Sequence, residues 1–74
     1  MRMRSDIAKS SILKVLNESG KPLGASQIVS TLLSMGVDLQ PRTVRHYLLK
    51  LDAQGHTRLV SRRVGREITE RGLD

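Results

Sequence analysis

Residues 41–54 are the part of this chain that most limits how it can fold. Val44, Leu48 and Leu51 recur at the three- and four-residue spacing that places side chains on one side of an α-helix, and Tyr47 falls on the same side. The other side of the same segment is polar and mostly basic. The segment therefore predicts an amphipathic helix whose apolar side packs inward.

Both ends of this helix are marked in the sequence. Pro41 suits the first turn, where its missing N–H has no intrahelical partner, and Gly55 can adopt the left-handed conformation that ends a helix. Gln40 occupies the N-cap position, where a shorter Ser, Thr, Asp or Asn side chain would better reach the free backbone N–H groups. We therefore expect a helix with clear boundaries and an imperfect cap at its start.

Apolar spacing before this segment predicts two further helices. The first begins at Ser5 or Asp6 and ends before Gly20, and the second begins between residues 24 and 27 and stops at Gly36. The predicted inward residues are Ile7 or Ala8, Ile12, Val15 and Leu16 in the first helix, and Ile28, Val29, Leu32 and Leu33 in the second.

The chain after residue 36 predicts a bent helix pair and then a β-hairpin. Residues 37–40 form a connection short enough to make the second and third helices a helix-turn-helix. Residues 56–69 hold β-favouring Thr, Val and Ile in two short runs around an arginine-rich turn, which predicts a hairpin or wing. Leu59 and Ile68 are the expected inward anchors. The expected tip is Arg62, Arg63, Val64 and Gly65, where Gly65 tolerates the positive φ of a tight loop.

These elements predict a single domain that is mainly α-helical with a small antiparallel β-hairpin. This is the winged helix-turn-helix, a three-helix bundle plus a wing. Leu23 is expected in a short extended segment between the first two helices, and residues 69–74 are expected to start one more helical turn. A chain of 74 residues has only a small core, and without Phe or Trp that core must be aliphatic.

The net charge of the chain is +6, and its location matters more than its size. Between Arg42 and Arg66 there are seven Lys or Arg residues against one acid, Asp52, so this segment holds the whole excess. A basic surface confined to about a third of a small domain is typical of a protein that binds a polyanion.

Several classes of function are disfavoured by what the chain lacks. It has no Cys, and its two histidines, His46 and His56, are far apart in the sequence, so neither a metal site nor a cofactor is expected. It has no nucleophile-elbow motif, no glycine-rich phosphate loop and no room for a closed pocket, so we expect no enzymatic activity. It has neither a membrane-length apolar run nor a secretory signal, so we expect a cytoplasmic protein.

From about Ile7 to its end, the chain resembles the winged-helix domain at the N-terminus of the archaeal global nitrogen-regulation repressor family. The residues that carry this resemblance are PRTVRHYLLKLDAQGHTR and SRRVGREITERG. Gln40 departs from the Ser expected before the Pro. The chain is similar, less closely, to the winged-helix segment that precedes the catalytic part of ribonuclease R.

The first resemblance implies a dimeric transcriptional repressor that binds palindromic operators upstream of nitrogen-assimilation genes. It also implies that 2-oxoglutarate is sensed by domains further along the chain, none of which is present in these 74 residues. We therefore expect residues 1–74 to be the N-terminal DNA-binding domain of a longer regulator. The full-length protein would be a homodimer, and the isolated domain a monomer.

The resemblance places four residues in a recognition helix and three in the wing, and Lys50 lies on the same basic side of that helix. Tyr47 is expected to fill the core, whereas Leu49 could contact a thymine methyl group, a second subunit or the wing. His46 is either a donor to DNA or an exposed bystander. The residues expected to contact double-stranded DNA are Arg42, Thr43, Arg45, His46, Lys50, Arg62, Arg63 and Arg66, together with the basic tail of residues 1–4.

Two alternatives to DNA binding remain open on the sequence alone. One is an RNA-associated accessory domain of a ribonuclease R-type nuclease, and the other is a winged helix that binds a protein. The first alternative predicts a preference for single-stranded RNA over duplex DNA, and the second predicts binding to neither nucleic acid.

Overall fold

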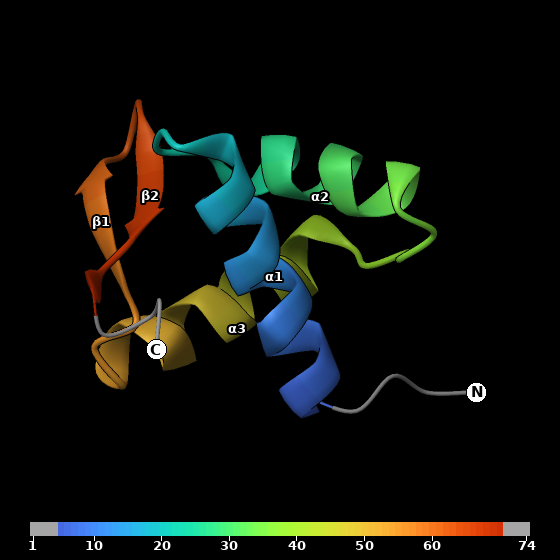
Figure 1. Ribbon diagram of the computed structural model, residues 1–74, viewed down its shortest axis with the longest axis horizontal. Coiled ribbons are helices and arrows are strands. Elements are labelled where there is room, and N and C mark those ends of the chain that lie inside the picture. The colour runs from blue at the N-terminus through green and yellow to red at the C-terminus, as the bar shows by residue number, and fades with distance from the viewer. Residues whose placement is uncertain (1–4, 71–74) are drawn as a thin grey trace.

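A computed structural model describes residues 5–70, which form three helices followed by a two-stranded antiparallel sheet (Figure 1). This arrangement confirms the predicted fold class. The predicted basic tail, residues 1–4, and most of the predicted last helical turn, residues 71–74, lie outside the described residues. The elements are α1 (Ser5–Ser19), α2 (Ala25–Ser34), α3 (Pro41–Ala53), β1 (Thr57–Ser61) and β2 (Gly65–Ile68).

The three helices pack against one another around a core made only of aliphatic side chains. α1 crosses the other two helices, and every pair of helices is in contact (Figure 1). Of the two candidates for the first inward position of α1, Ala8 is buried, while Ile7 is 51% exposed. The core consists of Ile12, Val15, Leu16, Leu23, Ile28, Leu32, Val44, Leu48 and Leu51.

The boundaries of α3 follow the sequence closely. Gln40 is the N-cap in an extended conformation and makes no capping hydrogen bond with its side chain, as predicted. At the other end the helix stops at Ala53, one residue earlier than expected, because Gln54 forms the C-cap and Gly55 takes a φ of 79°. Tyr47 is half-buried and packs against the core, which confirms its expected structural role.

The β-hairpin, residues 57–68 and hereafter the wing, is fastened to the connection between α1 and α2. Its strands pair with Thr57 opposite Ile68 and Leu59 opposite Arg66. Leu23 pairs in turn with Arg66, since the backbone N–H of each donates to the carbonyl oxygen of the other at 2.8 Å. The extended segment predicted at Leu23 is therefore confirmed, and it forms an isolated antiparallel bridge to β2.

Gly65 allows this close approach. Its φ is 109°, and a Cβ atom at this position would lie 2.2 Å from both the carbonyl carbon and the carbonyl oxygen of Leu23. The positive φ expected at Gly65 is confirmed, although the residue begins β2 and does not form the tip. The tip is the turn of residues 62–64.

Two predicted inward residues are exposed, and those predictions were wrong. Leu59 is 47% exposed because β1 extends beyond the edge of the core, so that Leu59 borders a surface depression instead. Leu33 is 58% exposed because it lies about 100° around the helix from Leu32, whereas Ile28 and Leu32 are buried and Val29 packs against the core. Ile68, the other predicted anchor of the wing, does pack against the core.

Candidate nucleic-acid interface

The outward side of α3 presents two unpaired arginines near the start of the helix. Arg42 and Arg45 are exposed, and within residues 5–70 neither makes an ion pair or a side-chain hydrogen bond. The core side of the helix, with Val44 and Leu48 fully buried, fixes which residues face outward. Because guanidinium groups without internal partners keep all their donors free, both residues can bind an external anion or a base edge.

The remaining predicted residues of α3 differ in exposure. His46 and Lys50 are exposed, and Lys50 lies in the last turn, where a cation is favourable to the helix dipole. Thr43 is half-buried, so only part of its side chain is accessible. Leu49 is 61% exposed on the same outward side, which leaves it free to contact a partner.

The turn of the wing presents a second pair of free arginines. Arg62 and Arg63 are exposed and have no ion-pair partner among the described residues. The turn itself is braced by Ser61, whose hydroxyl oxygen accepts a hydrogen bond from the backbone N–H of Val64 at 3.0 Å. The two arginines therefore project from a short turn whose backbone is held in place.

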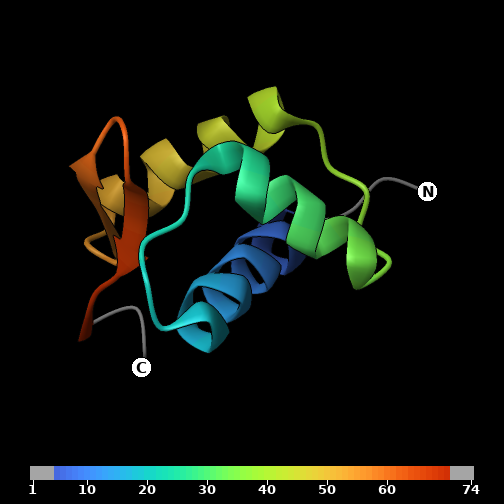
Figure 2. The same cartoon turned by 90° about the horizontal axis from the view of Figure 1, so that it is seen from above.

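The structure brings the helix and the turn that carry these arginines to one side of the molecule. Seen from above, α3 and the turn of the wing lie along one side, with α1 on the other (Figure 2). Arg45 of α3 and Arg62 and Arg66 of the wing line one open depression of about 320 Å³, together with Leu59 and the start of α2. Arginines of α3 and of the wing that are separated in the sequence thus border the same depression.

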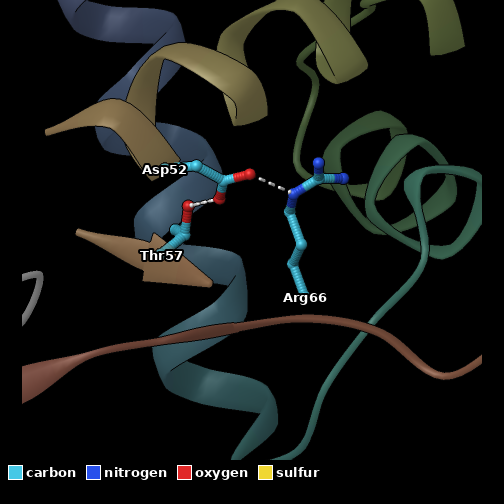
Figure 3. Close-up of polar contacts among 3 residues, drawn as sticks. All are labelled: Asp52, Thr57 and Arg66. Carbon is cyan, nitrogen blue, oxygen red and sulfur yellow. Dashed lines mark hydrogen bonds and ion pairs between the residues drawn. The ribbon is translucent and has the colours of Figure 1, made fainter. Parts of the chain in front are cut away.

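Two arginines of the wing are committed to partners inside the protein. Arg58 forms an ion pair with Glu67 on the exposed part of the sheet. Arg66 is half-buried, and its Nε donates to Oδ2 of Asp52 at 2.9 Å (Figure 3). Arg66 was predicted to contact DNA, and that prediction remains untested. The structure shows, however, that one of its donors is already in use.

The sequence gives no direct sign that Asp52, the single acid in the basic segment, joins α3 to the wing. Its Oδ1 accepts a hydrogen bond from Oγ1 of Thr57 at 2.6 Å, while its Oδ2 accepts the one from Arg66 (Figure 3). Thr57 is 3% exposed and is the one buried polar residue of the described chain. A clue was present in the sequence, because an acid near the end of a helix opposes the helix dipole and calls for another reason to be there.

The described residues offer neither a metal centre nor a membrane span. Among residues 5–70 no group of three or more His, Asp or Glu side chains is placed to hold a metal ion. Across the same residues no helix has both the length and the apolar character needed to cross a membrane. The chemistry available at this surface is hydrogen bonding and charge attraction from arginine and lysine.

Comparison with known protein families agrees with this geometry. The ribonuclease R winged-helix domain matches residues 10–74, which is most of the chain. The chain belongs to this winged-helix family. In this winged helix α2 and α3 form the helix-turn-helix and β1 and β2 the wing, so the predicted resemblance is confirmed at the level of the domain.

A relative of this winged helix is the global nitrogen regulator NrpRI of Methanosarcina mazei. The two are 41% identical over 61 residues, which cover 82% of this chain and 19% of the regulator. The winged helix therefore spans about a fifth of the length of that relative. No solved structure matches the chain.

Proposed function

We propose that this winged helix binds double-stranded DNA with a sequence preference, as the DNA-binding part of a cytoplasmic transcriptional repressor of nitrogen-assimilation genes. The observation that carries the proposal is the set of exposed, unpaired cations on α3 and on the turn of the wing, two elements that lie along one side of the molecule. The relative named as a global nitrogen regulator supports the regulatory role. The five cations are Arg42, Arg45, Lys50, Arg62 and Arg63.

In the proposed mechanism α3 enters the major groove with its first turns at the base edges. Arg42 and Arg45 lie in those turns, and an arginine can donate two hydrogen bonds to O6 and N7 of one guanine. Arg62 and Arg63, at the turn of the wing, would grip phosphates beside the groove or enter the adjacent minor groove. Base contacts would thus come from α3, and most of the sequence-independent affinity from the wing.

Salt titration tests the proposal most directly. The five unpaired cations can neutralise roughly four to five phosphates, so the affinity for a random duplex should fall with salt with a log–log slope of about −4 to −5. Fluorescence anisotropy of a labelled duplex at several salt concentrations measures this slope. A slope near zero would contradict nucleic-acid binding of any kind and would favour the protein-binding alternative.

RNA binding is the second candidate, because the family that matches the chain is named for a ribonuclease. A single-stranded RNA of the same length and label, titrated beside the duplex at two salt concentrations, separates the two candidates. Tighter binding to duplex DNA supports the repressor proposal. Tighter binding to the single-stranded RNA would replace it with an accessory role in RNA binding.

We also propose that the 74-residue chain is a monomer and that the longer regulator dimerises through other domains. The exposed apolar residues are spread over α1, α2, α3 and the wing, with the most exposed, Leu49, on the proposed DNA-binding side. In the dimer, two linked winged helices would then raise the affinity for DNA by binding the two half-sites of one operator together. Sedimentation that shows a tight dimer of this chain at micromolar concentration would contradict the proposal.

A further inference from the structure

The proposed interface has two parts, α3 and the wing, and it can use both at once only if their relative placement suits the shape of DNA. A hairpin of two short strands has little rigidity of its own, so contacts with the helices must set its direction. The bridge to Leu23 fastens β2 to the connection before α2. A separate contact is needed to fix the wing relative to α3.

Asp52 provides that contact. Its carboxylate lies in the last turn of α3, and its two oxygens accept hydrogen bonds from Thr57 of β1 and Arg66 of β2 (Figure 3). These bonds, at 2.6 and 2.9 Å, join α3 to both strands through one side chain. The side chains of Asp52 and Arg66 are only 26% and 17% exposed, so water competes weakly for the ion pair.

Helix energetics give no reason for an acid at this position. The last turn of a helix favours cations, and Asp is a poor helix former in the interior of a helix. Asp52 also lowers the positive charge of the surface that we propose to bind DNA. Its placement therefore disfavours both the helix and the affinity for a polyanion. What Asp52 provides in return is the pair of hydrogen bonds that joins α3 to the wing.

We propose that Asp52 is a positioning residue that holds the wing at a fixed angle to α3 and thereby sets how strongly the interface prefers one DNA sequence. This inference rests on the proposed function. It predicts opposite effects of losing Asp52 on two kinds of DNA. Random duplex gains affinity because a negative charge is lost and Arg66 is released, whereas the preferred duplex loses affinity because α3 and the wing no longer fit it together.

Glu67 offers a matched control for the charge. It pairs with Arg58 within the wing, as Asp52 pairs with Arg66, but it makes no contact with α3 in the described hydrogen bonds. Glu67→Gln therefore removes one negative charge beside an arginine without cutting the tie. Asp52→Asn is a second control, because an amide can still accept from Arg66 and donate to the hydroxyl of Thr57.

The experiment selects a preferred duplex from a random pool with the wild-type 74-residue chain. It then compares that duplex with a shuffled duplex of the same composition by anisotropy at about 0.1 M salt. Glu67→Gln and Asp52→Asn should raise the affinity for both duplexes about two- to fivefold and keep their ratio within about twofold. Asp52→Ala should raise the affinity for the shuffled duplex similarly but lower the ratio about five- to tenfold, since the wing must then be ordered on binding.

Circular dichroism melts establish that each variant is folded, and Ala is the better helix former at residue 52. Should Asp52→Ala fail to fold, Thr57→Val takes its place, because it keeps the shape of the side chain and removes only the hydrogen bond between Asp52 and β1. Since one of the two contacts that order the wing is then lost, the ratio of the two affinities should fall about two- to threefold. If Asp52→Ala, or Thr57→Val in its place, is folded and keeps the wild-type ratio of the two affinities, the inference is wrong while the proposed function stands. A wild-type chain that binds no duplex, or enriches no sequence from the pool, overturns the proposed function and the inference with it.

Discussion

The outward side of α3 and the wing are both rich in arginine, but they use it differently. On α3, Arg42 and Arg45 have no partner among the described residues, so their guanidinium groups are free for an external ligand. In the wing, half of the arginines are bound within the protein, Arg58 by Glu67 and Arg66 by Asp52. The comparison teaches that the charge counted along a sequence overstates the charge that a surface can offer to DNA.

The comparison also assigns different tasks to the two regions. A helix held by a buried apolar face places its outward side chains at fixed positions, which suits base recognition. The turn of the wing lies outside the core and carries exposed arginines, which suits contacts with a phosphate backbone whose charge repeats along the DNA.

Gly65→Ala should displace the wing from its contact with Leu23. A Cβ atom at residue 65 collides with the backbone of Leu23, and the φ of 109° adds strain, so we expect a loss of about 3 kcal/mol or more in the free energy of unfolding. Chemical denaturation measures this loss. Gly36→Ala is the control, since Gly36 also has a positive φ, of 84°, but no atom within 4 Å of the new Cβ, and it should lose only about 1 kcal/mol. Equal losses would show that the contact with Leu23 does not hold the wing.

Arg42→Ala or Arg45→Ala should cost roughly 1–3 kcal/mol in binding to a preferred duplex and relax the preference at one base pair. The loss on random duplex should be smaller, because the contact with a base edge forms only on the preferred sequence. Anisotropy titrations with both duplexes measure the two losses. A uniform loss on every duplex would move these arginines from base recognition to backbone contact.

Arg62→Ala or Arg63→Ala should weaken binding to preferred and random duplexes to a similar extent. Each loses one phosphate contact, so the log–log salt slope should become shallower by about 1. The measurement is the same titration repeated over a range of salt concentrations. If base preference changed instead, the wing and not α3 would recognise the sequence, and the roles assigned here would be inverted.

Arg58→Ala should have the smallest effect, although Arg58 lies on the same hairpin as Arg62. Its charge is already matched by Glu67 in an exposed pair, so we expect a change of less than about 0.5 kcal/mol on either duplex. Arg62→Ala, measured in the same buffers, is the reference. A loss at Arg58 as large as that at Arg62 would mean that the ion pair opens when DNA binds.

Local spacing in the sequence predicted the helices, their inward residues except Leu33, and the glycine that ends α3, because burial on a helix repeats every three or four residues. The same reasoning failed at Leu59. Alternation along a strand tells which residues share a face, but not how far the strand extends past the core. The wider winged-helix assignment followed from the order of the elements and the residues of α3 and the wing.

The tie at Asp52 could not be predicted from spacing at all. Asp52 and Arg66 are 14 residues apart and lie on different elements, so their contact depends on the hairpin register and on the direction in which the wing leaves α3. The sequence predicted a set of basic residues without separating the free ones from the paired ones. For Arg66 this leaves the predicted contact with DNA open, with its Nε already bound to Asp52.

The backbone pairing of Leu23 with Arg66 has a consequence for how the chain folds. Leu23 precedes α2 and Arg66 lies in the last strand, so their hydrogen bonds close a long loop, and closing long loops slows folding. The contacts of α2 with α1 and with α3 span shorter separations and can form first. We expect the helices to assemble before β2 docks against Leu23, so that the basic hairpin is the last part of the domain to fold and the first to detach.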